Sequence, residues 1–362
     1  MIKNAYIHIP FCTGKCFYCS FVSGISPNYK EEYLSALIKQ IKNEYRNEPV
    51  ETLYLGGGTP SLLEPDDIKK IIECFDLSKA EEITLETNPE TVTAEKFTEY
   101  KKLGINRVSL GVQTFDNTIL KLIGRRHNAD TINKSICDIK SAEFSNISID
   151  LIYGLPNQNL DLFKNDLEKA INFDIQHIST YGLKIEEGSL FYKNMPKSLP
   201  DDEEQAQMYL YLCDFLRKSN FEHYEISNFA KKGYESKHNN AYWQNKEYYG
   251  FGLNASGYRD NIRYKNISNF EEYIKNPFEK EEKIHLSLQE TRENEIFLAL
   301  RLKEGLDIDS FNKKYNVDFE GKYKNIIKKY SDLNMLKTKN RKCFLTKKGI
   351  LLSNEIMSEF IE

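Results

Sequence analysis

Three cysteines lie within eight positions near the start of the chain, in the segment "HIPFCTGKCFYCSF". They are Cys12, Cys16 and Cys19. A structural zinc ion takes four protein ligands, whereas a [4Fe–4S] cluster held by three thiolates keeps one iron free for another ligand. Phe21 stands where a fourth cysteine could follow, so the spacing predicts a [4Fe–4S] cluster. His8 is the alternative fourth ligand of a zinc site, but on a strand we expect it to be packed and hydrogen-bonded.

A glycine-rich segment, "GGGTPS" at residues 56–61, follows a short β-rich run. Glycines without side chains let the backbone approach a ligand closely, and their free N–H and C=O groups can then bond to it. Beside a cluster with an open iron, this segment favours S-adenosylmethionine as the ligand, because its amine and carboxylate can chelate that iron.

Polar residues also end or follow other β-rich runs. Glu86, Gln113 and Asp150 offer acceptors for ribose hydroxyls or an ammonium group, and Arg125 offers donors for a carboxylate. In a parallel α/β sheet, functional groups gather beyond the carboxyl ends of the strands. We therefore expect these side chains to meet at one rim.

Six β-rich runs alternate with helical patterns in the first half of the chain. The runs lie at residues 5–9, 52–56, 82–86, 107–112, 148–154 and 177–183. This alternation predicts an α/β fold whose parallel sheet curves into a partial (β/α)6 barrel. A closed eight-unit barrel is the alternative, but only six units precede residue 200. Thr93 and Gly104 are the expected caps of one intervening helix.

The sequence suggests three domains. Residues 1–200 form the partial barrel with the cysteine loop, and an aromatic-rich segment at 201–280 completes it. Residues 281–362 are rich in Lys and Glu, and "NMLKTKNRKCFLTKKG" within them is typical of a hairpin flanked by helices. That arrangement predicts a smaller, winged-helix-like α+β domain at the C-terminal end.

Composition limits the location and the partners. The chain has 362 residues and a formal net charge of -4, which gives no general reason to expect nucleic acid as a partner. No apolar run approaches the roughly 20 residues that span a bilayer, and "MIKNAYIHIP" lacks the features of a signal peptide. We therefore expect a cytoplasmic protein. The four remaining cysteines are expected to be small buried residues: Cys74, Cys137, Cys213 and Cys343.

Several segments resemble the radical SAM superfamily, and within it the coproporphyrinogen dehydrogenase-like group. They are "YIHIPFCTGKCFYC", "LYLGGGTPS", "LETNPE", "SLGVQTFDNTILKLIGR" and "IDLIYGLP". The resemblance implies a (β/α)6 barrel that holds S-adenosylmethionine on the cluster. By position, the residues matching the group's S-adenosylmethionine contacts are Tyr6, Tyr18, Gly57, Gly58, Thr59, Glu86, Gln113, Arg125 and Asp150.

Two kinds of protein in this group differ in sequence features that can be compared with this chain. The oxygen-independent coproporphyrinogen dehydrogenases typically carry a fourth cysteine two residues after the third and an extension ahead of the first strand. The HemW-type haem chaperones have Phe at that place, as Phe21 is here, and carry a His-Asn-x-x-Tyr-Trp motif associated with haem. This chain has "HNNAYW", His238 to Trp243. The sequence is therefore more similar to the chaperones.

The resemblance implies that His238 is a haem ligand. Haem needs an axial donor and an apolar pocket, and aromatic residues follow the histidine: Tyr242, Trp243, Tyr248, Tyr249 and Phe251. The alternative is that these rings pack a domain junction. Ser256 stands where the family usually has a second histidine, which puts a second histidine contact in doubt.

These observations predict a haem chaperone that carries a [4Fe–4S] cluster and S-adenosylmethionine and passes haem to an apo-haem protein. The resemblance is compatible with a homodimer and with peripheral contact with membrane-bound haem proteins. The alternative is an oxygen-independent coproporphyrinogen III dehydrogenase or another radical SAM enzyme acting on a tetrapyrrole. Enzymatic activity is left open, and no catalytic residue is assigned.

Overall fold

The computed structural model describes residues 1–361. The chain divides into two compact units. Unit 1 comprises residues 1–212 and 247–284, and unit 2 comprises residues 213–246 together with the chain from 285 onward. The aromatic-rich segment expected at 201–280 is thus shared between the units, and the three-part division from sequence stays a prediction.

Unit 1 is built on a parallel sheet with the strand order β6-β5-β4-β3-β2-β1-β9. All six expected strands are present, and their alternation with helices confirms the (β/α)6 arrangement. The strands are β1 (Asn4–Ile9), β2 (Thr52–Gly57), β3 (Glu82–Thr87), β4 (Arg107–Gln113), β5 (Ile147–Tyr153), β6 (His177–Gly182) and β9 (Tyr249–Phe251). The short strand β9 pairs with β1 at the edge of the sheet.

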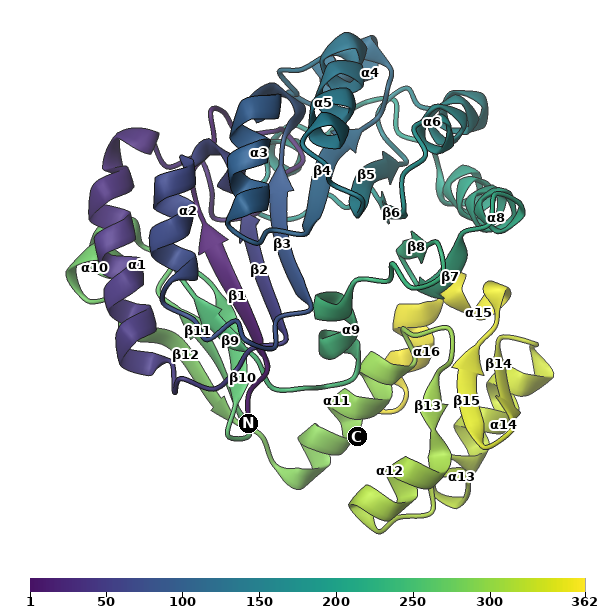
Figure 1. Ribbon diagram of the computed structural model, residues 1–362. Coiled ribbons are helices and arrows are strands. Elements are labelled where there is room, and N and C mark those ends of the chain that lie inside the picture. Colours follow the sequence, from purple (N-terminus) through teal and green to yellow (C-terminus); the bar gives the residue numbers. More distant parts are fainter. Residues whose placement is uncertain (362) are drawn as a thin grey trace. The chain divides into compact units, whose positions relative to one another are not determined.

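Helices connect the parallel strands, and α1, α2, α3 and α5 lie along the same side of the curved sheet (Figure 1). The connecting helices are α1 (Lys30–Glu44), α2 (Pro65–Ile72), α3 (Ala94–Lys102), α4 (Asn117–Leu122), α5 (Ala129–Ser141) and α6 (Leu160–Asn172). Later come α7 (Leu190–Lys193), α8 (Asp202–Lys218) and α10 (Phe270–Lys275), and single 3₁₀ turns occur at Pro27–Tyr29, Pro60–Leu62 and Pro89–Thr91.

Alternation along the strands explains the core of unit 1. Successive side chains of a strand point to opposite faces, so residues such as Ile7, Leu55 and Leu110 share one face and are fully buried.

The ends of helix α3 lie where the sequence predicted them. The Thr93 side chain accepts a hydrogen bond from the backbone N–H of Lys96, and Gly104 has φ +94 just beyond the end of α3.

A small antiparallel sheet completes unit 1, with the order β10-β11-β12. Its strands are β10 (Ser256–Arg259), β11 (Ile262–Asn266) and β12 (Lys280–His285). The hydroxyl oxygen of Tyr264 on β11 accepts a hydrogen bond from the backbone N–H of Gly250 at 3.0 Å. This contact ties the small sheet to β9.

Unit 2 contains the hairpin and helices expected near the C-terminal end. Its elements are β7 (Glu222–Glu225), β8 (Asn228–Ala230), α9 (Lys237–Trp243), α11 (Leu288–Ala299), β13 (Leu306–Asp307), α12 (Ile308–Tyr315), α13 (Phe319–Lys322), α14 (Lys324–Asp332), β14 (Leu336–Lys339), β15 (Lys342–Leu345), α15 (Lys347–Leu351) and α16 (Ser353–Ser358). The β14–β15 hairpin turns at Asn340 and Arg341, both with positive φ.

One expectation about the scattered cysteines is wrong. Cys213 and Cys343 are buried, but Cys137 is exposed and Cys74 is only partly buried. Cys137 follows Ile136 on α5, whose buried side chains include Ile136 and Ile139. A helix turns about 100° per residue, so the residue after Ile136 falls outside the buried stripe.

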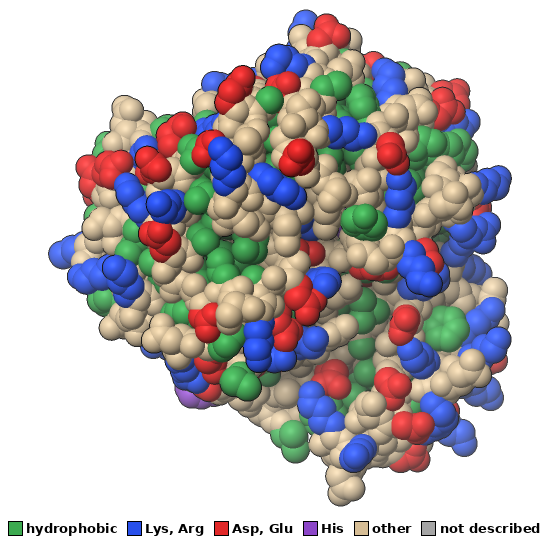
Figure 2. Space-filling view, viewed as in Figure 1, with side chains coloured by type: hydrophobic (Ala, Val, Ile, Leu, Met, Phe, Trp, Pro, Cys, Tyr) green, Lys and Arg blue, Asp and Glu red, His purple; other side chains and the backbone are tan. Residues whose placement is uncertain are grey.

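Within residues 1–361, no helix combines the length and apolar character needed to cross a membrane. Basic and acidic side chains are interspersed on the face shown in Figure 2.

Candidate functional site

One face of the parallel sheet in unit 1 carries a row of polar groups. Register places His8 beside Gly56, Glu86 beside Ser109, and Ser148 beside His177. Because residues two apart on a strand share a face, polar residues of neighbouring strands lie together on this side. The row ends at the carboxyl ends of the strands, where the cysteine loop leaves β1.

Backbone hydrogen bonds fix the cysteine loop against neighbouring segments. The N–H groups of Gly58 and Thr59 donate to the carbonyls of Ile9 and Phe11 at 2.7 and 2.8 Å. A Cβ added to Gly58 would lie 2.6 Å from the Phe11 carbonyl oxygen and 3.0 Å from Cys12 Sγ. Glycine is therefore required there for the glycine-rich turn to touch the cysteine loop.

The three cysteine sulfurs each lie near a polar side chain. Cys12 Sγ is 3.6 Å from Thr59 Oγ1, and Cys19 Sγ is 3.9 Å from Ser23 Oγ. Arg125 Nη1 donates to Cys16 Sγ at 3.6 Å. The cysteines are half-buried and form no disulfide.

The donor set of this loop consists of three thiols. A [4Fe–4S] cluster takes one thiolate per iron, so three thiols suit a cluster with one open iron. Hydrogen-bond donors beside the sulfurs also stabilise thiolates.

His8 is packed and hydrogen-bonded, as expected. Its Nε2 lies 2.9 Å from the Val22 carbonyl and its Nδ1 lies 3.1 Å from the Tyr6 hydroxyl. Burial lowers the pKa of His8 to about 4, so the ring is neutral at pH 7. A Cβ on Gly57, which has φ +112, would lie 2.6 Å from this ring. Gly57 therefore serves both the turn and the packing of His8.

Two carboxyl groups of the polar row are satisfied within the protein. Glu86 accepts from the Tyr54 hydroxyl at 2.7 Å and from the Gly57 N–H at 3.0 Å. Burial, together with the nearby charge of Asp150, raises the pKa of Glu86 to about 7. Asp150 accepts from the Ser109 hydroxyl at 3.1 Å, and burial raises its pKa as well. Each carboxyl is thus held in a fixed orientation.

The remaining expected residues of unit 1 lie on neighbouring segments. Tyr6 stacks on Tyr54 with ring centroids 6.1 Å apart, and burial raises the pKa of Tyr6 well above its ordinary value. Tyr18 packs against the buried cluster that includes Ile119 and Ile123. Gln113 ends β4 with φ +69.

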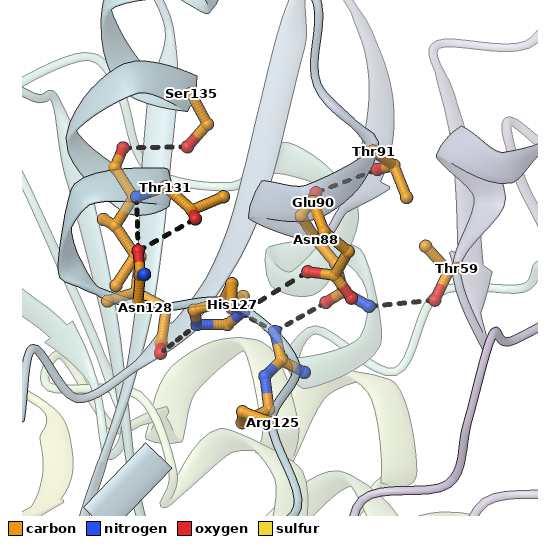
Figure 3. Close-up of polar contacts among 12 residues, drawn as sticks. Thr59, Asn88, Glu90, Thr91, Arg125, His127, Asn128, Thr131 and Ser135 are labelled. Atoms are coloured by element: carbon orange, nitrogen blue, oxygen red, sulfur yellow. Dashed lines mark hydrogen bonds and ion pairs between the residues drawn. The ribbon is translucent and has the colours of Figure 1, made fainter. Parts of the chain in front are cut away.

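Asn88 links the glycine-rich turn to Arg125, and the sequence reasoning missed it. Its Nδ2 donates to Thr59 Oγ1 at 2.9 Å, while its Oδ1 accepts from Arg125 Nη2 at 2.8 Å (Figure 3). Arg125 Nη2 also bonds the Gly111 carbonyl, and its buried Nε has no hydrogen-bond partner in the described chain. Asn88 follows β3 directly, so the strand-end rule could have found it.

A second pair, Glu90 and His127, adjoins this network in Figure 3. His127 Nδ1 lies 3.2 Å from Glu90 Oε2, and its Nε2 lies 3.3 Å from the Val112 carbonyl. A carbonyl oxygen only accepts, so Nε2 carries a proton. The contact with Glu90 then needs a second proton, held by either the imidazole or the carboxyl. This pair supports the chain on both sides of Arg125.

His238 belongs to unit 2, apart from the residues discussed so far. It lies on α9, capped by Ser236, and is 1% exposed. Its Nε2 is 2.8 Å from the Tyr242 hydroxyl. The aromatic residues expected around it are divided: Tyr242 and Trp243 share its unit, whereas the three rings from Tyr248 to Phe251 belong to unit 1. There Tyr249 and Phe251 are fully buried. Those two rings therefore serve as core residues of β9.

The structure thus brings the expected S-adenosylmethionine and cluster residues together in unit 1 and places His238 in unit 2. Ser256, at the start of β10, is exposed. Tyr54, Asn88, Glu90 and His127 are the polar partners of the site that the sequence did not single out.

Comparisons with known proteins agree with this architecture. Residues 6–170 match the Radical SAM superfamily, and residues 286–352 match the HemN C-terminal domain. The solved structure of coproporphyrinogen III oxidase (HemN) from Escherichia coli superposes with a TM-score of 0.87. It is 20% identical and covers 99% of this chain and 90% of its own. The fold is therefore that of the radical SAM proteins.

Similarity to curated relatives extends over nearly the whole chain. Heme chaperone HemW of Lactococcus lactis subsp. lactis (strain IL1403) is 38% identical over 370 residues, which cover 99% of this chain and 97% of the relative. Heme chaperone HemW of Bacillus subtilis (strain 168) is 35% identical, with 99% of both chains covered. The chain belongs to the HemW family, and the resemblance seen in its motifs is confirmed.

Proposed function

We propose that this protein is a haem chaperone, which binds haem and delivers it to an apo-haem protein. The observation that carries the proposal is the similarity to proteins named haem chaperones along almost the entire chain. The "HNNAYW" segment and Phe21 support it. The likeness to the HemN structure concerns the fold and does not assign an activity.

We assign a [4Fe–4S] cluster to Cys12, Cys16 and Cys19. A bound cluster of this kind supplies one electron and an iron with an open coordination position. The residues proposed to hold S-adenosylmethionine are those that match the family motifs: Tyr6, Tyr18, Gly57, Gly58, Thr59, Glu86, Gln113, Arg125 and Asp150. Asn88 supports two of them, since it bonds both Thr59 and Arg125.

We propose that the imidazole of His238 would supply a nitrogen ligand to the iron of bound haem. Its Nε2 is occupied by the Tyr242 hydroxyl, so coordination through Nε2 requires this hydroxyl to move away. Rotation of the tyrosine side chain would leave the backbone hydrogen bonds of α9 in place. Haem binding is therefore expected to change the environment of Tyr242.

Phe21 favours the chaperone over a dehydrogenase. Its side chain is 63% exposed at the end of the cysteine loop. A ring in this place offers no sulfur ligand, whereas the dehydrogenases typically have a thiol there. The acceptor of haem, a homodimer, peripheral contact with membrane-bound haem proteins, and a cytoplasmic location are further parts of the proposal.

An anaerobic experiment tests the function. The cluster is reconstituted in the full chain, and one sample is assayed for haem binding, for haem transfer to an apo-haem protein, and for S-adenosylmethionine cleavage with coproporphyrinogen III. We expect binding and transfer without protoporphyrinogen. Formation of protoporphyrinogen together with 5′-deoxyadenosine would contradict the proposal and favour the dehydrogenase.

Two variants test the axial ligand. His238→Ala is expected to weaken haem binding and to change the haem absorption spectrum, because the imidazole donor is lost. His285→Ala is the matched control, since His285 is exposed and is the first residue of the second stretch of unit 2, directly after the part of β12 that belongs to unit 1. Unchanged haem affinity and spectrum in His238→Ala would remove this residue from the site.

A further inference from the structure

Unit 2 encloses a cavity of about 600 Å³. Its walls come from the end of α8, from β7, from the turn after α11, and from β15 and α15. Sites for small organic ligands typically measure roughly 300–1,000 Å³. The cavity is therefore large enough for part or all of such a ligand.

Positive charge dominates the lining. Five basic side chains face two acidic ones: Arg217, Lys232, Arg301, Lys303 and Lys347, against Glu222 and Glu225. Asp214 pairs with Arg217 at 3.1 Å and also with Lys347. In the part of the chain that the structure describes, the other three cations have no carboxylate within ion-pair distance. The cavity thus has basic groups available for an anion.

Glu225 is the buried acidic side chain of the lining, and its charge acts on Arg301. It is 1% exposed, and its Oε1 is occupied by the side chain of Asn228 and by the backbone N–H of Ser227. Burial raises the pKa of Glu225, although Arg301 partly opposes that shift. Its Oε1 is therefore directed towards its own turn, while its buried Oε2 has no hydrogen-bond partner among the described residues.

The rest of the lining is mostly apolar, with Asn220 and His223 as its uncharged polar side chains. Phe221 and Leu300 are buried, and Leu345 is 6% exposed. Apolar side chains contribute little binding energy to a small hydrated anion such as phosphate. Combined with basic groups, it suits a ligand with an apolar body and carboxylate groups.

Arg301 connects this cavity to the segment that carries His238. Its guanidinium carbon lies 4.5 Å from the centre of the Trp243 ring, a cation–π distance. Its Nε is buried and has no hydrogen-bond acceptor within residues 1–361. A guanidinium over a ring still has N–H groups with which to donate hydrogen bonds, and carboxylates match their paired geometry.

We propose that this cavity receives the propionate groups of haem, with Arg301 and Lys303 as their binding residues. The proposal rests on the proposed function and adds a recognition site for the carboxylate edge of the cargo. Haem combines an apolar macrocycle with two carboxylates, which matches the two kinds of lining. Inorganic phosphate shares only the negative charge.

The single tryptophan provides the measurement, because Trp243 is the only one in the chain and contacts Arg301. Quenching of its fluorescence is followed while the full chain is titrated with protoporphyrin IX, which has no metal for His238 to bind. A second titration uses the dimethyl ester of the same porphyrin. We expect the ester to bind at least about tenfold more weakly, since it cannot accept charge-assisted hydrogen bonds as a carboxylate.

Variants identify the residues. Arg301→Gln is expected to weaken protoporphyrin IX binding about tenfold, and Arg301→Lys to weaken it less because the charge remains. Lys303→Gln, an exposed position that leaves the core intact, is expected to weaken binding about threefold. Arg341→Gln and Lys337→Gln are matched controls on the β14–β15 hairpin, and neither lines the cavity.

The outcomes separate this inference from the proposed function. Equal affinity for the acid and the ester, or unchanged binding in both Arg301→Gln and Lys303→Gln, would overturn the cavity assignment while haem transfer could still succeed. Displacement of the porphyrin by inorganic phosphate at an equal concentration would also overturn it. Carboxylate-dependent porphyrin binding without any haem transfer would support the cavity and contradict the chaperone function.

Discussion

Asn88 is the residue on which two proposed ligand contacts of unit 1 depend. Its amide nitrogen holds Thr59 and its amide oxygen holds Arg125. The same arginine reaches Cys16 Sγ, so one side chain relates the glycine-rich turn, the arginine and the cysteine loop. A residue of this kind acts by positioning its neighbours.

Replacing Asn88 by Ala is expected to reduce the free energy of unfolding by about 1–3 kcal/mol, because the partly buried Arg125 loses an acceptor and Thr59 loses a donor. Asn88→Asp keeps an oxygen for Arg125 and is expected to recover most of the loss. Urea unfolding measures both variants. If Asn88→Ala were as stable as the wild type, the bridge would contribute nothing to the site's framework.

Glu86 gives a pH-dependent prediction. Burial raises its pKa from 4.5 to about 7, so the folded state binds this proton more tightly than the unfolded chain does. The resulting stabilisation is present at low pH and is lost as the pH rises from about 4.5 to about 7. Glu86→Gln removes this titration. Relative to the variant, the wild type is expected to lose up to roughly 3 kcal/mol of stability over that range.

The measurement is the difference in free energy of unfolding between the wild type and Glu86→Gln at about pH 5 and about pH 8. Carboxyl groups remote from Glu86 titrate equally in both proteins, so they cancel in the difference. A difference that does not change with pH would show that Glu86 titrates normally.

Residue types and strand ends allowed much of this site to be predicted. Glu86, Gln113 and Asp150 each end or interrupt a recognisable β-rich run, so their shared face followed from the topology. Asn88 and His127 were not found, because an Asn before a proline and a histidine between helices are ordinary in sequence. Their roles depend on contacts with Arg125 and Glu90 that only the folded chain creates.

Among the elements, the end of β4 has an unusual backbone. Gln113 has φ +69, and the N–H of Thr114 bonds the carbonyl of Val112 at 2.9 Å. A hydrogen bond across one residue at positive φ forms a strained γ-turn. Asp166 of α6 supports it, accepting from the Thr114 hydroxyl at 2.8 Å and from the Phe115 N–H at 2.7 Å. The strain coincides with a proposed ligand contact.

Gln113→Gly is expected to raise the free energy of unfolding by about 1 kcal/mol, since glycine adopts positive φ without strain. The same change is expected to weaken S-adenosylmethionine binding, because the side chain amide is removed. Asn316→Gly is a matched control at φ 50 after α12; asparagine tolerates that conformation, so a smaller gain is expected. A loss of stability in Gln113→Gly would contradict the assignment of strain.

The order of elements was predictable, but their grouping was not. The alternation of β-rich runs with helical patterns predicted all six central strands. This succeeded because the hydrophobic period of a segment and its length can be read from the local sequence. Strand β9 has only three residues and no alternation to reveal it, and it reaches β1 from almost 250 positions away. Each unit is built from two separate stretches of the sequence. The boundary between the units therefore depends on which distant segments pack together, and no single linker marks it.

At the scale of the whole molecule, the proposed sites are divided between the units. All three cysteines and all nine proposed S-adenosylmethionine contacts lie in unit 1, whereas His238 and the basic cavity lie in unit 2. Each unit has its own buried core, and that of unit 2 includes Phe311, Phe319 and Phe360. Each set of proposed ligand contacts therefore lies within one unit.

This division predicts that the two kinds of ligand can be lost separately. A triple variant, Cys12→Ser with Cys16→Ser and Cys19→Ser, is expected to lose its iron and sulfide but to bind haem within about twofold of the wild type, as independent sites do. His238→Ala is expected to show the reverse, with normal iron content and weaker haem binding. Iron analysis and haem titration of each variant make the comparison. Joint loss of cluster and haem in the triple variant would mean that haem binding needs the cluster, and that transfer is coupled to the state of unit 1.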